Sequence, residues 1–483
     1  PDDLVWFDVY DDDGNLVSAG ELRNILSAVN AITTVAADFD FNDLSLNTIA
    51  EFDNDTIDAL FDSEVLVATI SDYLLNMDLG TTPLIIPDSV LDANNYLLSS
   101  ELKAVASSAQ VLVTDLACDE GDTACEDTGF DIAKAFSLSE TAIDTLTSSD
   151  ILAATIGNLI LDQGGSILTV PTSALSTISV DSVNQDVVSK AEIKNLFQAI
   201  SVLGFSDLEN MAFDASIISN LGLESDTTVL DTDKSSKLFG SKLVHATLSQ
   251  MLYDQAEGAS AVLNVPYFTE DSDPVRVYDA TDDLDYVANS ELDNLLQSLL
   301  TLNITDFANV DSLDISSVIA DADTLLDSSI LQATISKQIY DLGDSTISVP
   351  HLDANGDPIR ISVGDQGEGT NTEYIKREEL VAVLDSLELL GLTDIGTFDG
   401  TVGIDTVGDN LTDLLASATL HATISKQLVD LGDSTLTIPD QDVDSNDVII
   451  TVGTGLTETT YVSKAEIEAM FDALEVLGIT DVT

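Results

Sequence analysis

The sequence predicts an α+β fold repeated in tandem, because three landmarks return in the same order along the 483 residues. The first is a glutamate that follows a segment similar to Tyr461-Val-Ser-Lys-Ala, and its copies are Glu21, Glu101, Glu192, Glu291, Glu379 and Glu466. The second is an Ala-Thr pair inside an apolar run, at 68–69, 154–155, 246–247, 333–334 and 422–423. The third is a short β-type run that ends in proline, at Pro87, Pro171, Pro266, Pro350 and Pro439. Recurrence of this kind is typical of a tandem array.

We therefore expect about five small repeat domains, each with two helices and a small antiparallel sheet. The predicted boundaries are 1–86 for repeat 1, 87–170 for repeat 2, 171–265 for repeat 3, 266–349 for repeat 4, 350–438 for repeat 5, and 439–483 for the start of repeat 6. Domains of this length can bury a modest core of their own.

The first helix of a repeat starts at the landmark glutamate. In repeat 5 the spacing predicts a helix over 379–390, since apolar residues return every three or four positions. Ser189 and Ser463 each stand three residues before a landmark glutamate, which indicates a capping box. In that motif the glutamate carboxylate reaches back to the N–H of the serine. Gly391, twelve residues after Glu379, is expected to take the left-handed conformation that ends the helix.

The second half of a repeat contains a second helix and the strands. Repeat 5 predicts a helix from Leu420 to Gly432, in which Ala422 and Thr423 are small enough to let another element approach. The segment before it varies in length and starts with a Ser or Thr followed by Asp, which indicates a turn or a short helix. Alternating residues predict strands over 434–438, 448–452 and 459–462.

The formal net charge of −72 excludes two classes of partner. Nucleic acid and anionic membrane surfaces would both be repelled along the whole chain. No run of 18 apolar residues is present either, so no membrane insertion is expected in this segment. Of the 87 acids, 65 are aspartate and 22 are glutamate, and lysine is scarce. This balance suits a protein kept soluble in salty water, where salt screens self-repulsion, and indicates an extracellular setting.

The two cysteines, Cys118 and Cys125, lie close together in repeat 2. No histidine or further cysteine is near enough in sequence to complete a zinc site. A local disulfide is therefore predicted, which agrees with an oxidising extracellular location; a pair of reduced surface thiols is the alternative.

The sequence offers no catalytic constellation. Of the three histidines, His245 and His421 stand directly before an Ala-Thr pair, but the other copies have Val67, Ala153 and Gln332 there. Valine cannot take over the role of a catalytic histidine, so this position is not a shared catalytic site. We expect the histidines to be partly exposed residues on helices. No nucleophile elbow, phosphate loop or zinc-protease motif is present. The chain is predicted not to be an enzyme.

Calcium is the cofactor hypothesis that the sequence supports. The loop before each first helix is rich in aspartate and asparagine, whose oxygens can converge on a hard cation. The candidate ligands are Asp11, Asp13, Asp353, Asn355, Asp357, Asp440, Asp442 and Asp444. None of the loops has EF-hand spacing, and the same residue types also form simple hairpin turns. Both interpretations stay open at this stage.

These observations predict a non-enzymatic extracellular structural protein, the rod or fibre segment of a long microbial surface protein, adhesin or appendage. The organisation is similar to that of long repetitive cell-surface proteins of microbes, although no motif points to a named family. The alternative is a multivalent array that binds surface glycans or proteins, with calcium as a stabiliser. The expected partners are neighbouring repeats or further copies of the chain.

Overall fold

The computed structural model describes residues 17–35, 52–75, 78–79, 82–115, 138–164, 168–203, 232–256, 263–302, 322–341, 347–364, 371–391, 410–432 and 437–476. Within these ranges the chain is a mixed α+β protein, with helices and small two-stranded antiparallel sheets. The chain divides into two compact units, residues 1–212 with 236–247, and residues 213–235 with 248–483.

Each landmark glutamate lies in the first turn of a helix. These glutamate helices are α1 (Ala19–Val35), α5 (Ser99–Asp115), α9 (Lys190–Leu203), α13 (Asn289–Thr301), α17 (Arg377–Leu389) and α21 (Lys464–Val476). In α17 the predicted apolar stripe is buried, with Leu380, Val383 and Leu387 all 0% exposed. Gly391 follows with φ +72° and donates its N–H to the Glu388 carbonyl at 2.7 Å. The predicted helix over 379–390 and its glycine stop are confirmed.

The Ala-Thr pairs lie in a second set of helices. These threonine helices are α4 (Glu64–Leu75), α8 (Asp150–Gly164), α12 (Lys242–Ala256), α16 (Ser329–Asp341) and α20 (Ala418–Gly432). The prediction for repeat 5 is confirmed, since α20 covers the expected span and ends at the expected glycine.

A short helix precedes each threonine helix, which the prediction of two helices per repeat did not include. The short helices are α3 (Asn54–Phe61), α7 (Glu140–Leu146), α11 (Thr232–Gly240), α15 (Ala322–Leu325) and α19 (Leu411–Leu414). Asp53 caps α3 by accepting the Thr56 N–H at 2.8 Å, and Ser139 caps α7 by accepting the Ala142 N–H at 3.2 Å. Short polar residues are preferred at this position because their side-chain oxygen satisfies an N–H that the first turn leaves free.

The strands form antiparallel hairpins. The pairs are β1–β2 (Asp78–Leu79 with Thr82–Pro83), β3–β4 (Leu175–Val180 with Val183–Val188), β5–β6 (Arg276–Asp279 with Leu284–Val287), β7–β8 (Arg360–Gly364 with Asn371–Ile375) and β9–β10 (Ile449–Val452 with Thr459–Val462). The predicted strands over 448–452 and 459–462 are confirmed, with Tyr461 opposite Ile450. The predicted strand over 434–438 is not: residues 434–436 lie outside the described part, and 437–439 form no strand.

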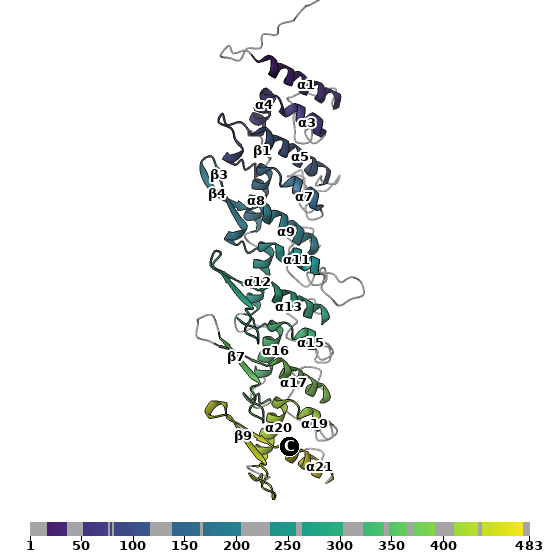
Figure 1. Cartoon of the computed structure of the whole chain (residues 1–483), viewed down its shortest axis with the longest axis vertical. Helices are drawn as coiled ribbons and strands as arrows, with labels where there is room; N and C mark the ends of the chain where they lie inside the picture. The colour runs from purple at the N-terminus through teal and green to yellow at the C-terminus, as the bar shows by residue number, and fades with distance from the viewer. Residues whose placement is uncertain are drawn as a thin grey trace, which may run out of the picture. The chain divides into compact units, whose positions relative to one another are not determined.

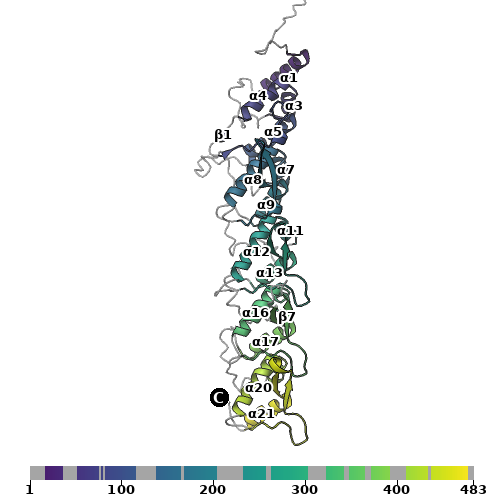
Figure 2. The ribbon, with the colours of Figure 1, turned by 90° about the vertical axis from the view of Figure 1, so that its left-hand side faces the viewer.

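Within each unit a hairpin packs against the threonine helix that precedes it in the sequence. In the first unit β4 contacts α8, and in the second β8 contacts α16 and β10 contacts α20 (Figures 1 and 2). One hydrophobic cluster continues across this contact: Ile424 and Leu428 of α20 pack with Val462 and with Phe471 of α21. The β9–β10 hairpin and the glutamate helix that follows it therefore share one core with the threonine helix that precedes them.

Candidate functional site: polar contacts that join consecutive segments

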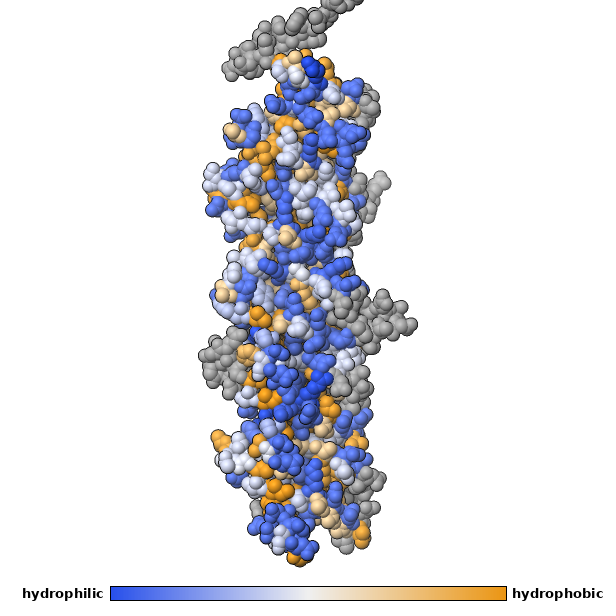
Figure 3. Space-filling model, in the orientation of Figure 1, coloured by the Kyte–Doolittle hydropathy of each residue, from blue (hydrophilic) through white to orange (hydrophobic). Residues whose placement is uncertain are grey.

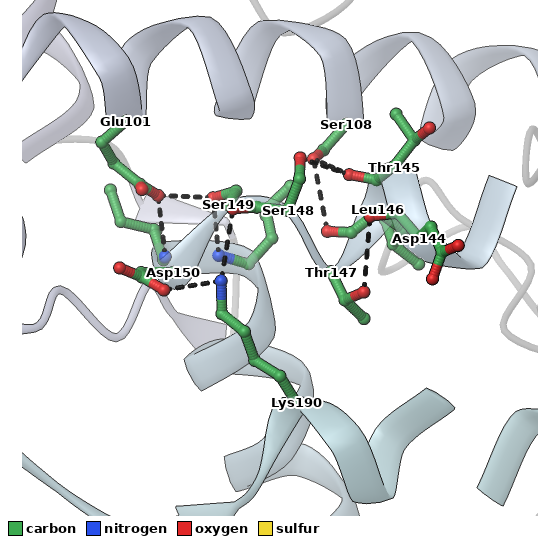
Figure 4. A network of polar contacts seen from close by, with 12 residues as sticks. Glu101, Ser108, Asp144, Thr145, Leu146, Thr147, Ser148, Ser149, Asp150 and Lys190 are labelled. Carbon is green, nitrogen blue, oxygen red and sulfur yellow. Dashed lines mark hydrogen bonds and ion pairs between the residues drawn. The ribbon is translucent and has the colours of Figure 1, made fainter. Parts of the chain in front are cut away.

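A buried carboxylate joins a glutamate helix to the threonine helix that follows it. Figure 4 shows Glu101, which accepts a hydrogen bond from the Ser149 hydroxyl at 2.6 Å and another from the Ile151 N–H at 2.9 Å. Ser149 in turn accepts the Leu152 N–H at 3.1 Å. Free N–H groups and the helix dipole both favour a carboxylate at a helix N-terminus. Glu101 therefore caps α8 across space.

The same arrangement recurs in four more copies. The bonds run to Glu21 from Ser63 and Val65, to Glu192 from Ser241 and Leu243, to Glu291 from Ser328, Ser329 and Ile330, and to Glu379 from Ser417, Ala418 and Thr419. The serine always lies six residues before the threonine of the Ala-Thr pair. That constant spacing is a signal that could have identified the partner from the sequence, and our sequence analysis missed it.

The predicted capping box is only half correct. The Ser189 hydroxyl does accept the Glu192 N–H, at 3.2 Å, as expected. The Ser189 N–H, however, donates to the Ala174 carbonyl at 2.9 Å, so no free donor remains for the glutamate to reach back to. The carboxylate is therefore available for Ser241, 49 residues further along the chain.

Burial shapes the acidity of these carboxyl groups. Burial raises the pKa of Glu192 and of Glu291, and the hydrogen bonds from serine and backbone donors offset only part of that increase. Glu21 lies nearer the surface; burial is the largest single influence and raises its pKa, but the hydrogen bonds from Ser63, Val65 and their neighbours together outweigh it and leave the pKa lowered. The direction of each shift thus follows how deeply the carboxylate is buried.

The threonine of the Ala-Thr pair binds the preceding predicted repeat. Its hydroxyl oxygen accepts an N–H two residues before a landmark proline, each at 2.9 Å: Thr155 from Ile85, Thr247 from Thr169, Thr334 from Asn264, and Thr423 from Ser348. Each hydroxyl also donates to the carbonyl four residues earlier in its own helix, as Thr423 does to Thr419 at 2.7 Å. The N–H before the proline is satisfied by this side chain. Residues 85, 169, 264 and 348 lie in no strand.

A serine two residues after the threonine binds the backbone just before the next glutamate helix, which in three of the four copies is the second strand of a hairpin. Its hydroxyl accepts the N–H of the residue four positions before the next landmark glutamate, each at 3.0 Å: Ser71 from Leu97, Ser249 from Val287, Ser336 from Ile375, and Ser425 from Val462. In α8 this position is Gly157, where an added Cβ would lie 2.5 Å from the Val188 carbonyl oxygen. The hairpin backbone therefore approaches α8 more closely than a serine side chain would allow.

The residue before the Ala-Thr pair reaches the same part of the hairpin. Gln332 donates to the Ile375 carbonyl at 3.1 Å, and His421 Nε2 lies 2.7 Å from the Val462 carbonyl. Ala153 is too short for this contact, and it lines a cavity of about 240 Å³ beside Val188. His245 is half-buried, but His421 is only 1% exposed, so the prediction of a partly exposed histidine is wrong there. Its ring packs 4.8 Å from that of Tyr461, which the sequence did not indicate.

His421 should make its segment sensitive to mild acid. Burial lowers the pKa of His421 below its ordinary 6.5, opposed by the Val462 carbonyl and Asp353 and reinforced by Lys464. Below pH about 6.5 the unfolded chain takes up a proton that the folded chain excludes, so stability falls as pH falls. For one group the slope can reach about 1.4 kcal/mol per pH unit. Hydrogen exchange of the α20 amides between pH 7 and 5.5, corrected for intrinsic exchange rates, measures this loss of stability.

The variant His421→Gln is the matched control for this pH dependence. Glutamine already makes the equivalent contact at Gln332, so the bond to Val462 should survive while the titration disappears. A variant that keeps the full pH dependence of the native chain would show that His421 is not its source.

A basic residue two positions before the landmark glutamate contacts the end of the preceding short helix. Lys190 donates to the Ser148 carbonyl at 3.2 Å and pairs with Asp150 at 2.6 Å (Figure 4). Arg377 pairs with Asp327 at 2.6 Å just after α15, and Lys464 donates to the Leu415 carbonyl just after α19. Cations favour helix C-termini, but such partly exposed pairs contribute only about 0.2–1 kcal/mol. These contacts therefore contribute more to the alignment of the glutamate helix with the preceding short helix than to the free energy of unfolding.

Two buried tyrosines in the second unit link a hairpin to the turn that precedes the hairpin before it. The Tyr374 hydroxyl donates to the Phe268 carbonyl, and the Tyr461 hydroxyl donates to the Leu352 carbonyl. Both rings are 0% exposed, and burial raises the pKa of each hydroxyl. Each bond joins residues more than one hundred positions apart in the sequence.

The candidate calcium ligands of repeats 5 and 6 lie in turns. Asp353 accepts the Asn355 and Asp357 N–H groups at 2.9 and 2.8 Å. Asp442 likewise accepts those of Asp444 and Asn446, both at 2.8 Å. These bonds lower the pKa of Asp442, the largest contribution coming from Asn446. Aspartates that hold their own loop in this way form ordinary turns.

The remaining candidate ligands are placed as follows. Asp440 contributes its carbonyl, which accepts the Val448 N–H at 2.9 Å, and the side chains of Asn355, Asp357 and Asp444 are exposed. Asp11, Asp13, Cys118 and Cys125 lie outside the described residues, so the disulfide stays a prediction. Within the described ranges, no three His, Cys, Asp or Glu side chains are grouped to hold a metal ion.

Calcium binding is tested by matched ionic strength. Screening alone predicts that sodium chloride and calcium chloride raise the thermal midpoint equally, because it acts on all carboxylates alike. Specific sites predict a larger rise in calcium, about 2.7 kcal/mol of added stability at a hundredfold excess over the dissociation constant. Equal thermal midpoints in the two salts would mean that the loops are simple turns, and would contradict the calcium hypothesis.

No helix in the described part of the chain is both long and apolar enough to span a membrane. Comparisons with protein-family models, with curated proteins and with solved structures found no match to the chain.

Proposed function

We propose that this chain is a segment of the rod or fibre of a long, non-enzymatic extracellular protein on a microbial surface. In this proposal it is a tandem array of about five small α+β repeats, and its first partners are its own neighbouring repeats. The observation that carries the proposal is the threonine contact, which joins each of four consecutive pairs of predicted repeats in the same way. Because the same contact can join any number of repeats, it suits a protein whose function is to span a distance.

The other junction contacts support the same proposal. The serine bonds and the tyrosine bonds also connect residues of adjacent predicted repeats; Ser425, Val462 and Tyr461 are all buried. Buried polar groups with defined partners favour one arrangement over others, because a shifted register would leave them unsatisfied. On the face drawn in Figure 3, hydrophilic residues predominate and apolar ones are scattered, which suits a segment that stays in water.

Duplication of one repeat tests the array. Residues 350–438 would be inserted a second time after position 438, which creates one new junction, between the two copies, from positions equivalent to those that pair in the native chain. We expect the longer chain to fold with unchanged hydrogen-exchange protection and a larger maximum dimension in X-ray scattering. Loss of protection on both sides of the insertion would contradict an array built from interchangeable repeats.

Labelling of intact cells tests the location. Antibodies against the chain should label the outside of unpermeabilised source cells, on filaments or on the cell surface. Labelling that requires permeabilised cells would contradict the extracellular role. Binding to a glycan array that is lost on shortening the chain would instead favour a multivalent binding protein.

A further inference from the structure

Helix α21 has the contact surface of the other glutamate helices, but among the described residues nothing covers it as those helices are covered. The position seven residues after the landmark glutamate is small in every copy. It is buried in five helices, with exposures of 0% for Ala28, Ser108, Ala199 and Ser298 and 1% for Ser386. The sixth copy, Ala473, is exposed. Met470 and Leu474 of α21 are also only half-buried, and Val476 is 87% exposed.

Two elements cover this surface in the other copies. The short helix lies on the small residue: Ser108 donates to the Thr145 carbonyl at 2.8 Å (Figure 4), and Ser298 to the Thr324 carbonyl at 3.1 Å. The serine at the start of the threonine helix lies on the landmark glutamate, as Ser417 does on Glu379 at 2.8 Å. The described residues include no such pair of elements on α21, and they give the Glu466 carboxylate no donor.

We infer that α21 is a docking surface for a short helix followed by a serine-capped helix, supplied by a further repeat of the same kind. The inference rests on the proposed array and names the partner of its last described helix. Charge selects this occupant, since the Glu466 carboxylate complements the positive end of a helix dipole and the N–H groups there. The small Ala473 side chain leaves room for a second helix to approach.

The experiment supplies the missing elements in cis. A copy of residues 397–432 is appended after Thr483, because Thr483 stands as far from Glu466 as position 396 stands from Glu379. We expect hydrogen exchange in α21 to slow by about tenfold or more relative to the native chain, as a newly capped and covered helix opens less often. A scrambled segment of equal composition is the control and should leave the exchange unchanged.

Two variants of the extended chain identify the contact. Glu466→Ala, or Ser→Ala at the copy of Ser417, should each remove most of the added protection, whereas neither should affect α17. Unchanged exchange in the extended chain, or protection that survives both variants, would overturn the inference. The repeat duplication described above leaves α21 untouched, so failure here and failure of the array are separate results.

Discussion

Replacing Glu379 with alanine should destabilise the segment around α20 by about 2–4 kcal/mol, since it removes a charged acceptor from several buried donors. The Ser417 hydroxyl and the Ala418 and Thr419 N–H groups, at 2.8, 3.0 and 2.7 Å, would lose their partner. Ser417 and Thr419 are both 0% exposed, so water cannot readily replace the carboxylate. Hydrogen exchange of the first turn of α20 measures the loss directly.

Two variants make this result specific. Glu379→Gln keeps one acceptor but presents an amide N–H to donors, so we expect a smaller loss than for alanine. Glu466→Ala removes the glutamate at the matching position of α21, where the described residues donate nothing to its carboxylate, and we expect almost no change. Equal losses in Glu379→Ala and Glu466→Ala would mean that the glutamate acts within its own helix, as the capping box predicts.

The difference between those two explanations shows where sequence reasoning reached its limit. The landmark glutamates, threonines and prolines were all found by their recurrence, and all three mark residues at or beside a junction contact. Their positions in helices followed from local rules of periodicity and capping. Which donor a carboxylate reaches is set by packing, and Ser417 is 38 residues from Glu379. No local rule links residues that far apart.

The short helices and the burial of His421 were missed in part for related reasons, since the segment before each threonine helix was expected to hold either a turn or a short helix. The segment between the glutamate helix and the short helix differs in length between copies. No constant spacing from the landmark glutamate therefore marked a third helix. His421 stands at a position where other copies have valine, alanine, histidine or glutamine, and that variation argued against a catalytic role. That variation said nothing about burial, because Gln332 and His421 reach equivalent carbonyls with different side chains. What Gln332 and His421 share is the backbone carbonyl that their side chains contact, and not the type of side chain.

At position 157 of α8, the close approach of the hairpin predicts the opposite of what the consensus of the copies would suggest. Serine occupies the position two residues after the landmark threonine in α4, α12, α16 and α20, so consensus would favour Gly157→Ser in α8. A Cβ at 157 would lie 2.5 Å from the Val188 carbonyl oxygen and 3.1 Å from its nitrogen, both backbone atoms of β4. Relief would require the hairpin to move away from α8. Overpacking of this kind typically costs about 1–3 kcal/mol.

We therefore expect Gly157→Ser to destabilise the contact between α8 and the β3–β4 hairpin, although glycine itself weakens a helix by about 1 kcal/mol relative to alanine. Hydrogen exchange of β4 should quicken, while exchange in α16 and β8, where Ser336 accepts the Ile375 N–H at 3.0 Å, should not. The reciprocal variant Ser336→Gly removes that acceptor and should quicken exchange at Ile375 alone among these strands. If Gly157→Ser instead slowed exchange in β4, the hairpin would have accepted the serine as the other copies do, and the close approach at Val188 would have no bearing on stability.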